Sequence, residues 1–221
     1  MLVVFLHGFL GTGNDWTEVI KHLPFPCMTF DLPGHGNSLP DFDLFAEMEK
    51  LPPFHLVGYS MGGRLCLQYS GKTLSLTLIS THLGLQTELE KQERLSKDQV
   101  TAEQILSTPI DQFLSQWYDQ PLFSSLRSKI DICGLRKKQT REGLADALMK
   151  FSLGKQPDYS NKKAQYILGE KDEKYRTLYQ KIPHTLIPDA GHAVHLENPI
   201  LLAKEIYERL LSNEVQLESM R

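Results

Sequence analysis

Six short apolar segments recur along the chain, and turn-forming or polar residues follow most of them. The first covers residues 2–6, is continuously apolar and stops at His7-Gly8. Such a run is typical of a strand buried on both faces of a parallel sheet, although periodicity alone also allows a buried helical segment. The other five segments are residues 28–32, 55–57, 76–80, 165–168 and 185–187. The pattern predicts six strands.

Helical periodicity lies between several of these predicted strands. Residues 64–69 follow the third strand with a helical pattern, and residues 201–210 carry an amphipathic repeat near the end of the chain. The interval 39–54 contains Pro52-Pro53 and leaves room for only a short crossover helix. Strands that alternate with helices predict a doubly wound α/β fold with a mostly parallel sheet.

Residues 85–159 break this alternation, because they show helical periodicity and no convincing strand. The apolar residues of 110–118 share one helical face, and residues 144–151 repeat that pattern. For the first of these helices we expect Thr108 as the N-cap and Pro109 as the first helical residue. We therefore expect a helical insertion between the fourth and fifth strands.

This insertion divides the chain into two parts. We expect an α/β core formed by residues 1–84 and 160–221, and a helical cap of residues 85–159 over the ligand-binding edge of the sheet. Residues 88–97, at the start of the cap, are highly charged and predict a solvated helix.

Composition places the chain among globular proteins. Its 221 residues are 41% hydrophobic and 23% charged, enough to bury a core without a disulfide or a metal. The formal net charge of −3 argues against a nucleic-acid partner bound through bulk positive charge. The longest aliphatic run near the start is too short to cross a membrane, and we find no secretory signal.

The chain has three cysteines, and none of them has C-x-x-C spacing. Cys27, Cys66 and Cys133 therefore suit free thiols in a reducing compartment. We expect a cytoplasmic protein that is a monomer or a small homo-oligomer, with no nucleic-acid or membrane partner.

Residues 58–62 read Gly-Tyr-Ser-Met-Gly and match the pattern G-x-S-x-G. A predicted strand precedes the motif and a predicted helix follows it, which is the context of a nucleophile elbow. The flanking positions are glycine because the sharp turn brings neighbouring backbone too close for a side chain. Ser60 is the candidate nucleophile or base, and the alternative is an ordinary serine in a glycine-rich turn.

A reactive serine needs a base, and the base needs a carboxylate that orients it. Asp172 follows the fifth predicted strand and His192 follows the sixth, so both are expected at the edge that carries Ser60. Glu170 competes with Asp172 for the acid role, and His195 competes with His192 for the base. We favour Asp172 and His192. The other histidines are dispersed along the chain, so we predict no metal site. The sequence has no dinucleotide-binding motif, so we predict no cofactor.

The turn after the first strand carries Phe9, and Met61 follows the candidate serine. In an elbow of this kind, backbone N–H groups at these two positions form the oxyanion hole. We therefore expect the amides of Phe9 and Met61 to stabilise a developing negative charge.

Together these motifs resemble the α/β-hydrolase superfamily over the whole core. The resemblance implies an α/β-hydrolase fold with an inserted helical cap and a shortened N-terminus, because the strands that commonly precede the first one are missing. Other segments resemble the 2-succinyl-6-hydroxy-2,4-cyclohexadiene-1-carboxylate synthase family of menaquinone biosynthesis. These segments are residues 58–64, 82–86, 117–123, 156–158, 169–175 and 195–199.

That resemblance implies a lyase that eliminates pyruvate from a cyclohexene with three carboxylates. It also implies that Ser60, activated by His192 and Asp172, acts as the base without forming an acyl-enzyme. The substrate-binding residues that match the family are Tyr59, Arg64, Arg94, Trp117 and Arg136.

The residues leave other interpretations open. Each arginine is also compatible with a solvated helix position, and Trp117 with the core. Ala193 stands where the family commonly has a polar residue. The alternatives to the lyase are a carboxylic-ester hydrolase with Ser60 as covalent nucleophile, and a non-catalytic receptor for a small molecule.

Overall fold

The computed structural model describes residues 1–137 and 139–219, with side chains up to residue 212. Within this part of the chain, six parallel strands form one sheet in the order β2-β1-β3-β4-β5-β6. The strands are β1 (Val3–Leu6), β2 (Cys27–Phe30), β3 (Phe54–Tyr59), β4 (Thr73–Ile79), β5 (Gln165–Gly169) and β6 (Thr185–Ile187). All six predicted strands are confirmed.

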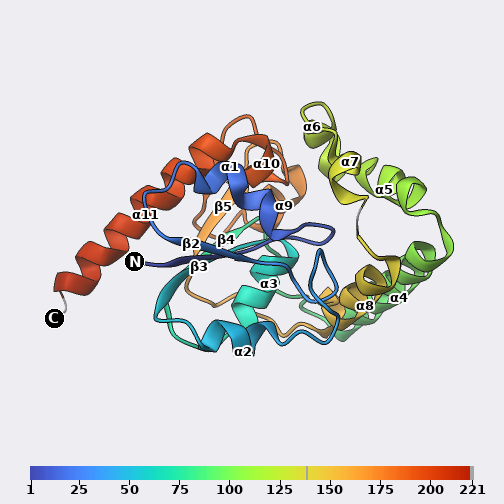
Figure 1. The fold of residues 1–221 in the computed structure, drawn as a ribbon, viewed down its shortest axis with the longest axis horizontal. Helices are drawn as coiled ribbons and strands as arrows, with labels where there is room; N and C mark the ends of the chain where they lie inside the picture. Colours follow the sequence, from blue (N-terminus) through green and yellow to red (C-terminus); the bar gives the residue numbers. More distant parts are fainter. Residues whose placement is uncertain (138, 220–221) are drawn as a thin grey trace.

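Helices cover both faces of the sheet, which explains why β1 is fully buried (Figure 1). The core helices are α1 (Thr17–Ile20), α2 (Leu44–Glu49), α3 (Met61–Gln68), α9 (Glu173–Leu178), α10 (Val194–Glu197) and α11 (Pro199–Ser219). In Figure 1, α2 and α3 lie on one face, whereas α1 and α11 lie on the other. The crossover helix α2 is only six residues long, as its proline-containing interval predicts. The doubly wound fold is confirmed.

The strand order changes direction between β1 and β3. From β1 the chain moves outward to β2, and then returns to place β3 on the other side of β1. Loops at the carboxyl ends of strands flanking such a switch point diverge and leave a crevice for a ligand. The turns after β1 and β3 both open onto this crevice, so the fold places the Phe9 turn beside Ser60.

The segment between β4 and β5 is called the cap below, and all the secondary structure described in it is helical (Figure 1). Its helices are α4 (Glu88–Ser107), α5 (Ile110–Tyr118), α6 (Ser124–Arg127), α7 (Ile132–Arg136) and α8 (Arg141–Lys150). Helix α4 begins with a capping box in which Thr87 and Glu90 bond each other's backbone. The boundaries at residues 85 and 159 stay a prediction.

Residues 88–97 form a helix without a buried residue, as predicted, but helix α4 continues to Ser107 and buries Asp98, Ala102 and Ile105. One detail of the cap differs from the sequence prediction. Thr108 does not cap the next helix: it ends α4, and its N–H donates to the Gln104 carbonyl at 3.0 Å. Because Pro109 follows it, Thr108 takes an extended conformation, and Pro109 itself stands at the N-cap of α5.

Among the described residues, no helix has both the length and the apolar character needed to span a bilayer. Helix α11, the longest, buries Leu202, Ala203, Ile206 and Leu210 against the sheet side of the core. This confirms the amphipathic repeat. The three cysteines are free thiols, as predicted.

Candidate active site

Ser60 occupies a strained turn between β3 and α3. Its backbone has φ 50° and ψ −110°, a region that non-glycine residues rarely adopt. A side chain at Gly62 would collide with the carbonyls of Leu6 and His7, which lie at the end of β1. The strain and the close approach of β1 are the features of a nucleophile elbow, and they present the serine at the carboxyl edge of the sheet.

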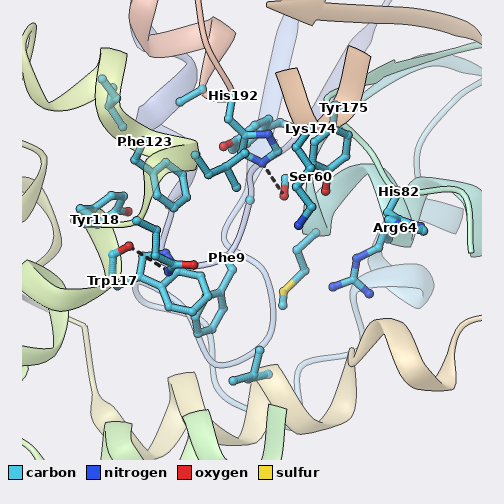
Figure 2. Close-up of a pocket in the computed structure, with 18 of the residues that line it drawn as sticks. Phe9, Ser60, Arg64, His82, Trp117, Tyr118, Phe123, Lys174, Tyr175 and His192 are labelled. Carbon is cyan, nitrogen blue, oxygen red and sulfur yellow. Dashed lines mark hydrogen bonds between the residues drawn. The ribbon is translucent and has the colours of Figure 1, made fainter. Parts of the chain in front are cut away.

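His192 lies between Ser60 and Asp172. Its Nδ1 is 2.7 Å from Asp172 Oδ2, and its Nε2 is 3.4 Å from Ser60 Oγ (Figure 2). Asp172 is buried and is also the N-cap of α9, where it accepts the Tyr175 N–H at 3.2 Å. The cap bond fixes the carboxylate, the carboxylate orients the imidazole, and the imidazole can accept the serine proton.

The two competing residues lie in other surroundings. The exposed Glu170 accepts the Asp189 N–H at 3.3 Å and makes no contact with His192. His195 is fully buried, and its Nε2 is 3.9 Å from Asp15. Its ring packs against Tyr59, with centroids 4.3 Å apart, and burial lowers its pKa. The structure therefore brings Asp172 and His192, and not the competitors, to Ser60.

The turn after β1 presents backbone amides beside the serine. At Gly8, a side chain would lie 3.4 Å from Ser60 Cβ and would collide with the Tyr59 ring. Among the described residues, the N–H groups of Phe9 and Met61 donate to no protein acceptor, which leaves both available. This is the condition that an oxyanion hole requires.

Two buried histidines support this turn in their neutral form. His7 Nε2 accepts the Leu32 N–H at 2.9 Å, and its Nδ1 lies 2.7 Å from the Gly8 carbonyl, to which it can donate. An imidazolium could not accept the first of these bonds. Burial lowers the pKa of His7 to about 4 and that of His35 to about 3.

Acid is expected to destabilise the protein well above the pKa of its carboxylates. The unfolded chain takes up protons on these histidines near pH 6.5, whereas the folded chain does not until the pH reaches their lowered pKa values. The free energy of unfolding should therefore fall from pH 6.5 downward, by roughly 3 kcal/mol per histidine at pH 4. Urea unfolding at a series of pH values measures this. For His35→Phe, the free energy of unfolding should depend less steeply on pH. An unchanged slope would contradict a lowered pKa for His35 in the folded protein.

A pocket opens above Ser60, between the sheet edge and the cap. All five predicted binding residues line it, namely Tyr59, Arg64, Arg94, Trp117 and Arg136. Figure 2 shows Phe9, Trp117, Tyr118 and Phe123 on one side of the serine, and Arg64, His82, Lys174 and Tyr175 on the other. On the aromatic side, the rings of Trp117 and Phe9 lie 5.2 Å apart. Among the described residues, no cluster of three or more His, Cys, Asp or Glu could hold a metal ion.

Arg64 and Arg94 place two positive charges on the basic side of the pocket. Arg64 lies one helical turn after Ser60 and donates to the Phe151 carbonyl of the cap at 2.6 Å. Burial, followed by the charge of Arg94, lowers the pKa of Arg64 to about 10, so it remains a cation at neutral pH. Arg94 donates through Nε to Asp98 at 2.8 Å. In turn, the Ser152 hydroxyl donates to Asp98 at 2.7 Å. These contacts orient the Arg94 guanidinium.

Two further cations, Lys174 and Lys97, line this pocket and were not predicted from the sequence. Burial lowers the pKa of Lys174, and the charges of Arg94 and Lys97 lower it further. A lysine whose pKa is lowered by neighbouring positive charges marks a site that an anionic ligand would stabilise. The signal available in the sequence was the place of Lys174, two residues after Asp172 in the first turn of a helix at the sheet edge.

Arg136 lines the pocket, but its guanidinium is occupied. It forms a bidentate pair with Asp15 of the core, at 2.6 and 2.7 Å, and both side chains are at most 5% exposed. Burial alone would raise the pKa of Asp15, but the contacts with His195 and Arg136 hold it well below its usual range. The pair joins cap helix α7 to the core.

Removal of Asp15 should destabilise the protein strongly. Asp15→Ala leaves the buried Arg136 charge without a partner, which typically costs about 3–5 kcal/mol in the free energy of unfolding. The matched control is Asp111→Ala, because Asp111 is exposed and lies 3.6 Å from the exposed Lys137. Loss of that surface pair should cost about 0–1 kcal/mol in urea unfolding. Equal effects of the two substitutions would contradict a structural role for the buried pair.

Comparison with known proteins assigns the chain to a family. The alpha/beta hydrolase family matches residues 3–205. A Salmonella typhimurium protein named 2-succinyl-6-hydroxy-2,4-cyclohexadiene-1-carboxylate synthase is 35% identical over 224 residues, which cover 89% of this chain and 88% of that protein. The chain belongs to this synthase family. The Escherichia coli protein of the same name is 34% identical over 223 residues, with the same two coverages.

Solved structures support the assignment. MenH from S. aureus superposes with a TM-score of 0.88 at 26% identity and covers 97% of this chain and 94% of its own. A thermophilic esterase from Thermogutta terrifontis has a TM-score of 0.72 at 21% identity, and the match covers 96% of this chain and 90% of the esterase. The esterase therefore shows a shared fold alone. The predicted α/β-hydrolase fold and the resemblance to the synthase family are both confirmed.

Proposed function

We propose that this synthase-family protein eliminates pyruvate from 2-succinyl-5-enolpyruvyl-6-hydroxy-3-cyclohexene-1-carboxylate and forms 2-succinyl-6-hydroxy-2,4-cyclohexadiene-1-carboxylate. The observation that carries the proposal is a cluster of cations, Arg64, Arg94 and Lys174, in the pocket that holds Ser60 and His192. The substrate carries three carboxylates, and charge-assisted hydrogen bonds to such groups are among the strongest available. A small polycarboxylate therefore suits this pocket.

In the proposed mechanism, the elimination begins with a proton transfer. Ser60 Oγ gives its proton to His192 Nε2 and removes the ring proton next to the succinyl ketone. Asp172 stabilises the imidazolium that forms. The ketone oxygen gains negative charge, and the amides of Phe9 and Met61 donate hydrogen bonds to it. Each of these groups acts from the position that it holds in the structure, and no covalent intermediate forms.

The electrons of the broken C–H bond then drive the departure of pyruvate. The enolate forms a double bond within the ring, the existing ring double bond shifts by one position, and the C–O bond to the enolpyruvyl group breaks. The leaving group departs as the enolate of pyruvate and gains on carbon the proton that His192 releases, directly or through water, so Ser60 and His192 return to their starting protonation states. Atoms and electrons balance without any oxidant or reductant, and the products are a conjugated cyclohexadiene and pyruvate.

The same residues give the substrate its orientation. Arg64 and Arg94 bind carboxylates on the basic side, and Trp117 packs against the ring from the cap. Tyr59, next to the serine, lines the floor of the pocket. Arg136 binds from the α7 side, but its pairing with Asp15 leaves it the smallest share of carboxylate binding among the three arginines.

Pyruvate release tests the proposal directly. Purified protein is incubated with the enolpyruvyl substrate, and pyruvate is followed by NADH oxidation with lactate dehydrogenase. We expect catalytic release together with the absorbance of the conjugated diene. The alternative is a carboxylic-ester hydrolase with Ser60 as covalent nucleophile. Rapid turnover of short nitrophenyl esters without any pyruvate release would establish that alternative and reject the synthase activity.

A further inference from the structure

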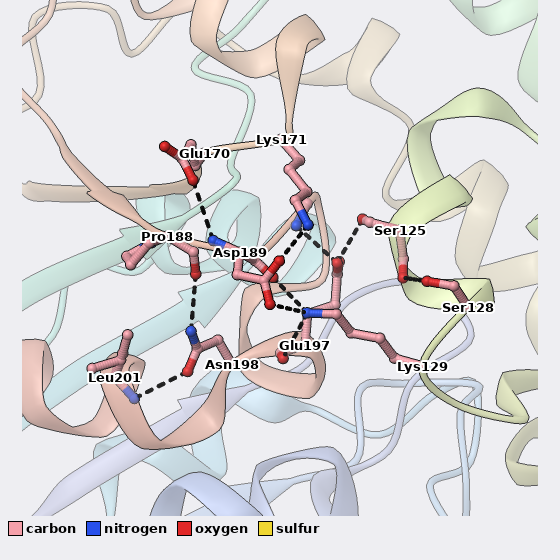
Figure 3. A network of polar contacts seen from close by, with 11 residues as sticks. Ser125, Ser128, Lys129, Glu170, Lys171, Pro188, Asp189, Glu197, Asn198 and Leu201 are labelled. Atoms are coloured by element: carbon pink, nitrogen blue, oxygen red, sulfur yellow. Dashed lines mark hydrogen bonds and ion pairs between the residues drawn. The ribbon is translucent and has the colours of Figure 1, made fainter.

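The loop that carries His192 is held by one carboxylate. Glu197, in α10, is 8% exposed and reaches back to the loop (Figure 3). Its Oε2 accepts the Gly191 N–H at 2.8 Å, and its Oε1 accepts the Ala193 N–H at 3.1 Å. These two amides flank the histidine on either side. The carboxylate therefore fixes the backbone from which the imidazole extends.

The cap contacts the same carboxylate. Ser125, in α6, donates its hydroxyl to Glu197 Oε2 at 2.6 Å. A side chain at Gly191 would collide with this hydroxyl and would lie 3.2 Å from the carboxylate, so the contact requires glycine next to the histidine. Lys129 adds a second link between the cap and the loop, because its ammonium donates to the Asp189 carbonyl at 2.5 Å and to the Glu197 carbonyl at 3.4 Å (Figure 3).

We propose that Glu197 is a positioning residue for His192, and that Ser125 couples this position to the cap. The proposal rests on the proposed role of His192 as the acceptor of the Ser60 proton. The distance from His192 Nε2 to Ser60 Oγ is 3.4 Å, at the outer limit of a hydrogen bond, so a small rotation of the loop would break it. Asp172 orients the imidazole ring, whereas Glu197 fixes the position and direction of the His192 backbone.

Glu197→Gln tests the positioning role with little change in shape. An amide has one acceptor oxygen, so one of the two flanking N–H groups would face an NH₂ group instead of an oxygen. We expect kcat for pyruvate release to fall roughly 10- to 30-fold, because misplaced catalytic groups lose rate steeply. KM should change little, because the cations of the pocket are untouched. Glu208→Gln on α11, an exposed glutamate, is the matched control and should match the wild type.

A fluorophosphonate gives a second readout that does not depend on the natural substrate. Ser60 Oγ attacks phosphorus, fluoride leaves, and the serine proton passes to His192. The inactivation rate constant of Glu197→Gln should fall by a similar factor. If the wild-type protein released no pyruvate while this slowing appeared, the proposed function would fail and the positioning role would stand.

A folded Glu197→Gln protein, judged by circular dichroism, with kcat and inactivation rate within twofold of the wild type would overturn the positioning role. If Glu197→Gln does not fold, Ser125→Ala decides, because it removes the contact from the cap and leaves both amide bonds. We expect its inactivation rate to fall roughly 2- to 5-fold, and an unchanged rate would reject the coupling.

Discussion

Ser60→Ala is expected to lower kcat for pyruvate release by roughly 10²- to 10⁴-fold, the usual contribution of a positioned general base. The substitution removes the hydroxyl that, in the proposed mechanism, transfers the substrate proton to His192, while Asp172 and His192 keep their 2.7 Å contact. The arginines of the pocket remain in place, so KM should stay within a few-fold of the wild type. Steady-state assays of pyruvate release measure both constants.

Ser212→Ala, an exposed serine of α11, provides the matched control and should retain full activity. A mass spectrum of the wild-type protein during turnover adds a mechanistic check, because general-base catalysis leaves Ser60 without a covalent adduct. Full activity of Ser60→Ala would contradict the assignment of the base. An accumulated acyl-enzyme would instead favour the ester-hydrolase mechanism.

The strands and the catalytic turns could be predicted because their signals are local. A buried strand is a short apolar run, and the turn after it must carry small or polar residues in a fixed order. Ser60 and His192 each follow such a run, and parallel strands bring their carboxyl ends to one edge. Sequence spacing alone was therefore enough to bring both residues to the same crevice.

Contacts between the cap and the core could not be predicted in this way. Asp15 and Arg136 are 121 positions apart, and nothing in the local pattern of either indicates a partner. Lys97 in the cap and Lys174 in the core look like ordinary charged residues of solvated helices, and they share a site only because the cap lies over this edge of the core. Thr108 illustrates a third kind of failure, because a Thr-Pro pair is equally compatible with the end of one helix and the beginning of the next.

The overall charge of the protein says little about this site. The chain is net negative, at −3, yet cations gather around the serine. Electrostatic attraction at a pocket depends on the charges within a Debye length, about 8 Å at physiological ionic strength, and on how well water is excluded. Four basic side chains lie on one side of the pocket, namely Arg64, Arg94, Lys97 and Lys174. Their attraction for an anionic ligand therefore outweighs the repulsion from an acidic surplus that is spread over the surface.

Arg94→Ala is expected to lower kcat/KM for the tricarboxylate by roughly 100-fold, near the lower end of the range for losing a hydrogen-bonded charge partner. The lower end applies because the side chain is 32% exposed and water screens part of its charge. Asp98 already accepts a hydrogen bond from Nε, so under the proposed function the two terminal nitrogens are the ones available to a substrate carboxylate. A pre-oriented guanidinium binds with less loss of side-chain entropy than a free one.

The selectivity of this loss distinguishes a binding arginine from a structural one. Arg94→Ala should scarcely change any turnover of a neutral nitrophenyl ester, because such a substrate offers no carboxylate to Arg94. Arg127→Ala, an exposed arginine on α6 paired with Asp119, is the matched control and should leave both activities unchanged. Equal losses for the charged and the neutral substrate would mean that Arg94 supports the fold of the cap and does not bind the substrate.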